Sequence, residues 1–439
     1  MTLEEAKQAA LAVEQSAPAQ WEIRYQRPSV EYRGVLPSWC PIIYDVVSGL
    51  ILEVALVFMY ACYLNDSNSE NKKNTLHAIA QDLCDWWRYL EAFELSWIDA
   101  LTTNLDGYVA SMRVTLSPKT GEEYSPTTIK RRISTIKSFY SWASTQNWIA
   151  QLTNARLDLL VSPGVAAAYF KRDLKSDHKP NPLLPMHAKA ALHAVGLLPT
   201  ELLAQISNIT AASDSEKIQA KLTQECSLRL ACHLALEVGL RVEEISKLPL
   251  NKFVEYIARD DFVDTGKYKL SVKGKGGKTR VIDIAGVLLR EVVVYIKEIR
   301  PRIIDGAKKS SKNLLVHSMA AGIRWCGLHM STRTLQRAFV GACISLGLTT
   351  AHVVSVVEDG KADAQKIVSK SLYTFHDLRH SYAVWTYYVL LREGTRDPWS
   401  AVQKQLGHSN KSTTLNIYLD IAGDYEAVMS DAYMEHILS

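Results

Sequence analysis

Cysteine pairs are the first feature that this chain lacks. Its seven cysteines are scattered over 439 residues, and none stands in a Cys-x-x-Cys pair. An odd, scattered set argues against a disulfide framework or a zinc site, and it fits a reduced, cytoplasmic compartment best. The opening MTLEEAKQAALAVEQ is polar and acidic, unlike a secretory signal.

The sequence also lacks a strong net charge. Its 50 Lys and Arg against 46 Asp and Glu leave +4, which is too weak to indicate a nucleic-acid partner. The balance is uneven, however: residues 1–70 carry four basic and nine acidic side chains, a net of −5, so residues 71–439 carry +9. Residues 124–180 hold nine basic and three acidic side chains. The basic charge is therefore concentrated in the later part of the chain.

A convincing membrane segment is missing as well. Residues 46–64 have nearly the length of a membrane span, but Glu53 interrupts them. Asp45 and the pair Ser48-Gly49 predict a turn, followed by a buried helix at about 53–64. With 47% hydrophobic and 22% charged residues, the chain has the composition of an ordinary globular protein, neither collagen-like nor wholly disordered.

Hydrophobic spacing predicts a mainly α-helical protein with a small β-sheet, of the α+β class. Helices are expected at 75–93, 97–115, 127–142, 186–195, 199–207, 214–239, 285–300, 332–345, 377–392, 399–406 and 411–420. In residues 267–284, polar and apolar side chains alternate on both sides of the sequence GKGG, and this pattern predicts a β-hairpin. We expect the chain to divide into an N-terminal extension (1–70), suited to protein contacts, an all-helical domain (71–170), a charged, proline-containing linker (171–185) and a larger domain (186–439).

Four stretches of the later half carry side chains that suit anionic oxygens. They hold Arg241 with Glu244, Lys275 at the tip of the hairpin, the pair His376 and Arg379, and His408 followed by Tyr418. Each has an ordinary explanation when taken alone: an ion pair within a helix, a solvated lysine, a helix-surface pair and a core tyrosine. GKGGK resembles part of a phosphate loop, but no GxxxxGK[ST] is present.

Together these side chains suit phosphoryl transfer. Guanidinium groups bind non-bridging phosphate oxygens and stabilise the charge that grows in a pentacoordinate transition state. A lysine on a hairpin can protonate a leaving oxygen, and a histidine can exchange a proton with the nucleophile. A tyrosine with cationic neighbours can attack phosphorus, and the resulting phosphodiester stores the bond energy for the reverse step.

The order of these residues resembles the tyrosine site-specific recombinases, or phage-type integrases. Four sequence motifs carry the resemblance: GLR, GKGGK, HDLRHSYA and LGHS…STT…IY. The family's core-binding domain is similar to a further segment, SPTTIKRRISTIKSFYSWASTQNWI. The resemblance covers about 71–425 and implies a SAM-like helical core-binding domain followed by a mixed α/β catalytic domain.

The resemblance implies a role for each site residue. Arg241 and Arg379 would bind the scissile phosphate, and His408 would hydrogen-bond a non-bridging oxygen. Lys275 would protonate the leaving 5′ oxygen, His376 would assist proton transfer, and Tyr418 would form a 3′-phosphotyrosyl bond. Glu244 would support the site. No metal and no cofactor are implied.

The same resemblance implies partners and DNA contacts. The partner would be double-stranded DNA with a specific recombination site. On that DNA the protein would form a homo-tetramer, and the reaction would pass through a Holliday junction. Accessory DNA-bending or transposition proteins are further candidate partners. The segment after Tyr418 would be exchanged between protomers. Candidate DNA contacts are Lys130, Arg131, Arg132, Lys137, Lys273, Lys278 and Arg280, of which the first four are expected on the surface.

Two spacings depart from the family pattern, and several alternatives stay open. The stretch from Arg379 to His408 is long, and the gap from His408 to Tyr418 is one residue longer than expected. Tyr425 and Tyr433 are backup nucleophiles, ahead of Tyr382. Alternative functions are a type IB topoisomerase and a DNA-binding protein without catalysis; a metal-dependent nuclease ranks last because carboxylates are few in the candidate site.

Overall fold

A computed structural model describes ten stretches of the chain. They are residues 21–25, 39–65, 72–117, 121–146, 181–209, 215–259, 263–274, 279–305, 307–358 and 361–407. The chain divides into two compact units: residues 1–178 with 354–366, and residues 179–353 with 367–439. The mainly helical architecture with small antiparallel sheets that the sequence predicts is confirmed.

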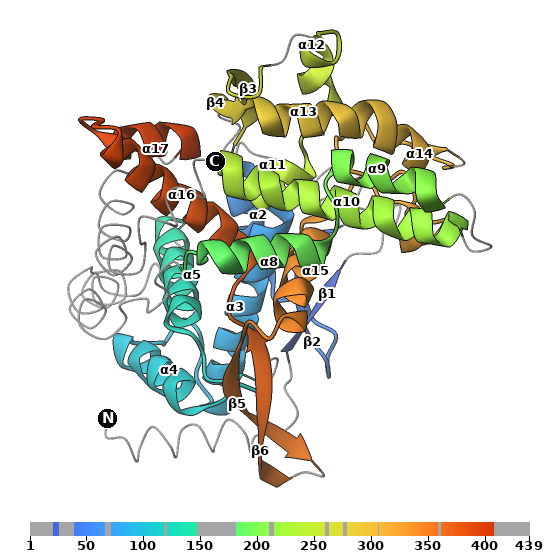
Figure 1. Ribbon diagram of the computed structural model, residues 1–439. Coiled ribbons are helices and arrows are strands. Elements are labelled where there is room, and N and C mark those ends of the chain that lie inside the picture. The colour runs from blue at the N-terminus through green and yellow to red at the C-terminus, as the bar shows by residue number, and fades with distance from the viewer. Residues whose placement is uncertain are drawn as a thin grey trace. The chain divides into compact units, whose positions relative to one another are not determined.

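The first unit packs a short hairpin and four helices around one core (Figure 1). Strands β1 (Trp21–Tyr25) and β2 (Pro41–Asp45) pair antiparallel, and the helices are α2 (Glu53–Asn65), α3 (Lys72–Ala92), α4 (Thr102–Val114) and α5 (Pro126–Thr145). The helix α2 is the buried helix that the sequence predicts at about 53–64. No helix in the described stretches is long and apolar enough to cross a membrane. The hairpin β1–β2 was not expected from the sequence.

Aromatic side chains fill the core of this unit. Trp86 is fully buried and donates to the hydroxyl of Tyr140 at 3.2 Å, and this hydroxyl in turn donates to the carbonyl of Trp97 at 2.8 Å. Phe139 packs edge-on against Phe58 with ring centroids 5.5 Å apart. These contacts fix α5 against α2 and α3, because large rings in a dense core tolerate few alternative packings.

Arg132 on α5 is part of this packing, so the expectation that it lies on the surface is wrong. Its side chain is 9% exposed and pairs with Asp85 at 2.5 Å, and it donates to the hydroxyl of Tyr108 at 3.1 Å. The sequence reads as a basic run, Lys130 to Arg132, but successive helix positions are about 100° apart, so this third residue faces inward. We therefore no longer count Arg132 among the candidate DNA contacts.

The second unit is built around the long helix α10. This helix (Ser215–Val238) contacts α8 (Pro185–Val195), α9 (Pro199–Ile209), α13 (Gly286–Val294), α15 (Thr332–Ser345) and α16 (Phe375–Arg392). In Figure 1 it crosses the middle of the unit in yellow-green, with α13 on one side and α8 on the other. The remaining helical segments are α11 (Val242–Ser246), η2 (Leu250–Phe253), α12 (Val254–Ile257), η4 (Tyr295–Ile299), α14 (Arg300–Ile304), η5 (Met319–Ala321) and α17 (Pro398–Leu406).

Two hairpins belong to the later half of the chain. Strands β3 (Lys267–Lys273) and β4 (Thr279–Ala285) pair antiparallel from Lys267↔Ala285 to Lys273↔Thr279, which confirms the predicted hairpin. Strands β5 (Thr349–Glu358) and β6 (Lys361–Ser371) form a longer one that the sequence analysis missed. Its signal was present in the sequence, because a valine-rich segment is followed by an Asp-Gly pair at 359–360, and Asp-Gly is a strong indicator of a two-residue hairpin turn.

The buried ion pairs of α5 give a stability prediction. Replacing Arg132 by alanine leaves Asp85 and the hydroxyl of Tyr108 without this partner, so we expect the free energy of unfolding to fall by about 3 kcal/mol. Lys130→Ala, on the same helix but exposed, should change it by less than about 0.5 kcal/mol. Urea unfolding followed by tryptophan fluorescence measures both. Equal stability of the two variants would contradict the buried role of Arg132.

Candidate active site

Arg241 is positioned by the tight turn between α10 and α11. Gly239 has a φ of +71°, and a Cβ on it would lie 2.5 Å from a ring carbon of Tyr382, so both the backbone and the available space favour glycine. Arg241 precedes the first turn of α11, where its backbone N–H donates to Glu244 at 2.9 Å. Its guanidinium donates to the same carboxylate at 3.1 Å. This is the ion pair that the sequence offers as the ordinary explanation of Arg241, and the structure contains it.

His376 and Arg379 are positioned by the start of α16. The backbone N–H and hydroxyl of Thr374 both donate to the carboxylate of Asp377 at 2.8 Å, which fixes the first turn. Arg379 is 2% exposed. It donates to the carbonyls of Gly239 and, at 2.7 Å, of Leu406. These carbonyls stand at the C-terminal ends of α10 and α17, where helix carbonyls lack partners within the helix.

Arg241 shares an acceptor with Arg379. Its guanidinium lies 3.5 Å from the carbonyl of Leu406, the same oxygen that Arg379 contacts. Two permanently charged groups therefore converge on one carbonyl, although their residues are 138 positions apart in the sequence. An anion placed between them would replace the carbonyl as the better acceptor.

Glu244 holds a second arginine, Arg280 of β4. Arg280 donates to both carboxylate oxygens, at 2.6 and 2.8 Å, and its Nε donates to the carbonyl of Gln405 at 3.1 Å. Burial raises the pKa of Glu244, but the hydrogen bonds from Arg280 and from the backbone N–H of Arg241 outweigh it, and the net pKa is lowered. The stability that this ionised carboxylate contributes is therefore present at neutral pH and lost as the pH falls through its folded pKa.

His376 lies within the field of this cluster. Burial and the positive charges of Arg379 and Arg241 lower its pKa. At neutral pH the imidazole is therefore uncharged and can accept a proton. Its ring lies edge-on to that of His380, with centroids 4.5 Å apart.

The structure brings only part of the predicted set together. Arg241, Glu244, Arg379 and His376 form one site, and Arg280 joins it in a role that the sequence analysis did not assign. Lys275, Lys278, His408 and Tyr418, with the backup residues Tyr425 and Tyr433, lie outside the described residues. The contact of Arg280 with Glu244 spans 36 positions, so no local pattern indicates it.

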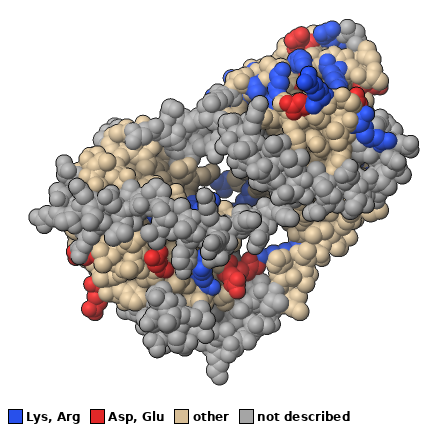
Figure 2. All heavy atoms as spheres, turned by 90° about the vertical axis from the view of Figure 1, so that its left-hand side faces the viewer, with Lys and Arg blue, Asp and Glu red and all other residues tan. Residues whose placement is uncertain are grey.

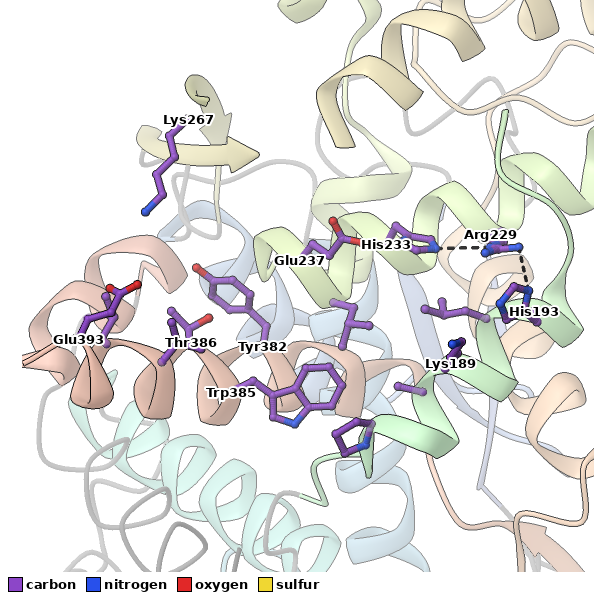
Figure 3. Close-up of a pocket in the computed structure, with 16 residues that line it drawn as sticks. Lys189, His193, Arg229, His233, Glu237, Lys267, Tyr382, Trp385, Thr386 and Glu393 are labelled. Atoms are coloured by element: carbon purple, nitrogen blue, oxygen red, sulfur yellow. Dashed lines mark hydrogen bonds and ion pairs between the residues drawn. The ribbon is translucent and has the colours of Figure 1, made fainter. Parts of the chain in front are cut away.

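Tyr382 is a poor nucleophile in this arrangement. Burial raises its pKa to about 12, which disfavours the phenolate. It lines a separate cavity of about 550 Å³ between α8, α10 and α16, together with Trp385 and His233 (Figure 3). In that cavity a polar chain runs from His233 through Arg229 to His193, with both contacts at 3.4 Å.

Lysines gather on the hairpin β3–β4. Lys267, Lys269 and Lys273 alternate along β3 and are all exposed, whereas Leu270 and Val272 face the core. Figure 2 shows this gathering of Lys and Arg over the part of the second unit that holds α12, β3 and β4. In the first unit Lys130 and Arg131 are exposed and Lys137 is half-buried. The guanidinium of Arg131 forms an ion pair with the carboxylate of Asp82 at 2.6 Å, so part of its charge is already neutralised.

A metal cluster is not apparent at the site. Among the described residues, no group of three or more His, Cys, Asp or Glu side chains is arranged to hold a metal ion. Glu244 and Asp377 are occupied by hydrogen bonds from arginine and threonine groups. The chemistry that the described side chains offer is therefore that of guanidinium and imidazole groups.

Comparison with known proteins decides the family. Residues 203–423, just over half of the chain, match the phage integrase family, and residues 62–147 match its N-terminal SAM-like domain. The chain belongs to the phage integrase family. The matched range spans Arg241, Glu244, His376 and Arg379, and it also spans three predicted site residues outside the described part of the chain: Lys275, His408 and Tyr418.

Relatives and solved structures agree with this family. The chain is 26% identical to the tyrosine recombinase XerD of Caulobacter vibrioides over 357 residues, 81% of this chain and 88% of the relative. It is also 26% identical to XerD of Staphylococcus saprophyticus over 341 residues, 78% of this chain and 86% of the relative. A crystal structure of the XerH site-specific recombinase bound to a palindromic difH substrate, in the post-cleavage state, shares the fold with a TM-score of 0.52, 16% identity, and coverage of 86% and 94%.

The electrostatics of His376 give a titration prediction. We expect its pKa to lie below the ordinary value of about 6.5, and Arg241→Gln to raise it, because a nearby positive charge disfavours the imidazolium. NMR titration of the histidine-labelled chain, assigned with His376→Gln, measures both values. His352, on β5, serves as an internal control for the effect of the substitution. A pKa at or above the ordinary value would contradict this site geometry.

Proposed function

We propose that this protein is a site-specific tyrosine recombinase that cuts and rejoins DNA through a covalent phosphotyrosyl intermediate. The observation that carries the proposal is the convergence of Arg241 and Arg379 on one oxygen position, beside a neutral His376. The family match and the recombinase relatives support it. They do not favour a type IB topoisomerase or a DNA-binding protein without catalysis.

In the proposed reaction the two arginines hold the scissile phosphate. The phenol oxygen of Tyr418 attacks phosphorus, the bond to the 5′ oxygen breaks, and Lys275 gives that oxygen a proton. His376 accepts the phenol proton, and Arg241, Arg379 and His408 stabilise the charge on the non-bridging oxygens. A 3′-phosphotyrosyl bond remains. The free 5′ hydroxyl of another strand then attacks it and releases the tyrosine, so the cycle consumes no ATP.

The DNA partner follows from the same proposal. The XerH recombinase, whose fold this chain shares, is bound to its difH substrate in the solved structure, and this chain presents a lysine-rich hairpin close in sequence to Lys275. We propose that Lys273 and Lys278, with Lys130, Arg131 and Lys137 of the first unit, contact phosphates. Such contacts give affinity that falls with salt and carry no sequence information by themselves.

We propose a homo-tetramer that brings two duplexes together and passes through a Holliday junction, acting in the cytoplasm, with DNA-bending or transposition proteins as accessory partners. The segment after Tyr418 would be exchanged between protomers. It carries five acidic residues and no Lys or Arg, so its partner surface should be basic or apolar.

A covalent-trapping experiment tests the proposed nucleophile. Wild-type protein is mixed with a library of random duplexes, DNA that stays attached after denaturation is sequenced, and a suicide substrate is built on the recovered site. We expect a covalent adduct on a denaturing gel with the wild-type chain and none with Tyr418→Phe.

Two controls complete this test. Tyr425→Phe should leave the adduct intact, and EDTA should have no effect because the proposed mechanism uses no metal. Wild-type protein that traps no DNA above the Tyr418→Phe background would contradict the proposal. An adduct that persists in Tyr418→Phe would contradict the nucleophile, and an adduct lost in EDTA would contradict metal-free cleavage.

A further inference from the structure

Arg280 is enclosed by protein acceptors on three sides. Its side chain is 13% exposed, and its two terminal nitrogens form a fork with both oxygens of Glu244, at 2.6 and 2.8 Å. Its Nε donates to the carbonyl of Gln405 at 3.1 Å. A guanidinium whose charge is paired and whose Nε, NH1 and NH2 all donate to protein is poorly placed to bind a phosphate on the surface.

The end of α17 is fitted around Arg280. Gly407, the residue after this helix, has a φ of +67°, and a Cβ on it would lie 2.6 Å from the Cδ of Arg280. The side-chain amide of Gln405 forms a second connection, accepting from the N–H of Asp283 at 2.9 Å and donating to its carbonyl at 2.7 Å. The last turn of α17 is therefore attached to β4 by two separate sets of hydrogen bonds.

The Glu244 carboxylate is the group for which two arginines compete. It receives two bonds from Arg280 but a single bond from the guanidinium of Arg241, at the longer distance of 3.1 Å. Arg241 is the more exposed of the two, at 24% against 13%. A buried carboxylate needs charged partners, so without Arg280 it would draw Arg241 into the fork.

We propose that Arg280 is a positioning residue for DNA cleavage, not a DNA contact. By neutralising Glu244, it keeps the remaining donors of Arg241 directed to the scissile phosphate. This inference rests on the proposed recombinase function. It differs from the expectation drawn from the sequence, in which the position of Arg280 in a basic hairpin suggests phosphate binding.

Single-turnover cleavage of the trapped DNA site tests the inference. Arg280→Met should slow formation of the covalent adduct about 100-fold, as loss of a preorganised donor does, because Arg241 turns to Glu244. Its affinity for the uncleaved duplex and the salt dependence of that affinity should match wild type. A lost phosphate contact would instead lower the salt slope by about 0.9.

A substrate with a methylphosphonate at the scissile position separates positioning from general damage. A neutral methyl replaces one charged oxygen there, so the reaction depends less on Arg241. We expect the defect of Arg280→Met to shrink to less than about 3-fold on this substrate, as a defect in charge stabilisation should. A merely structural defect would slow cleavage of both substrates equally.

Two further variants keep the test decisive. Arg280→Lys retains the positive charge, so it should fold even if Arg280→Met does not, but one ammonium cannot replace the fork. It should cleave about 10-fold more slowly than wild type on phosphate and recover on methylphosphonate. Gln405→Ala is the matched control, because it removes the other connection of α17 to β4 and leaves Glu244 neutralised; it should cleave within about 3-fold of wild type.

The outcomes distinguish this inference from the function on which it rests. No adduct with wild-type protein would contradict the recombinase proposal itself. A wild-type adduct with normal cleavage by Arg280→Met and Arg280→Lys would overturn the positioning role alone. Equal losses on both substrates, a reduced salt slope, or a matching loss in Gln405→Ala would overturn it as well.

Discussion

The burial of Arg379 is the constraint on which the rest of the site depends. A guanidinium stays charged at any physiological pH, so its enclosure requires acceptors. The chain supplies them as the carbonyls of Gly239 and Leu406, at the C-terminal ends of α10 and α17. These helix ends carry partial negative charge, and both must therefore meet at α16. Gly239 is needed at that meeting point because a side chain there would collide with Tyr382.

The remaining charges are arranged around this junction. Arg241 approaches the carbonyl of Leu406 from α11, and Arg280 connects β4 to the end of α17. Three guanidiniums thus surround one helix end, with Glu244 ionised between two of them. Burial and the positive charges of Arg379 and Arg241 lower the pKa of His376. The guanidiniums also provide a preorganised site for an anion. In the proposed reaction that anion is the scissile phosphate, and the protein carbonyl is its substitute in the absence of DNA.

Local patterns allowed much of the fold and site to be predicted from the sequence. Apolar spacing located the helices, and an ion pair between Arg241 and Glu244 could be anticipated because the two residues are three positions apart at a helix start. Residues 285–300 were predicted as one helix, but α13 ends at Val294 and a π-helical turn follows at Tyr295–Ile299. Such a local change in hydrogen bonding leaves no clear trace in hydrophobic spacing.

Contacts between distant segments account for what the sequence could not supply. Arg132 reads as one of three basic neighbours, yet tertiary packing against Asp85 and Tyr108 buries it. Arg280 reads as part of a basic hairpin, yet its partners are Glu244 and Gln405. For both arginines, the residues that determine the role of the side chain lie more than twenty positions away in the sequence. By contrast, the missed hairpin β5–β6 carried an Asp-Gly signal that hydrophobic spacing alone did not weigh.

The most direct measurement is a structure of the protein with a nicked duplex of its own site and orthovanadate, which mimics the pentacoordinate phosphorus. The account predicts that Arg241 and Arg379 leave the carbonyl of Leu406 and contact equatorial vanadate oxygens, while Arg280 remains on Glu244. Vanadate bound away from both arginines, or Arg280 rather than Arg241 in contact with it, would contradict the account.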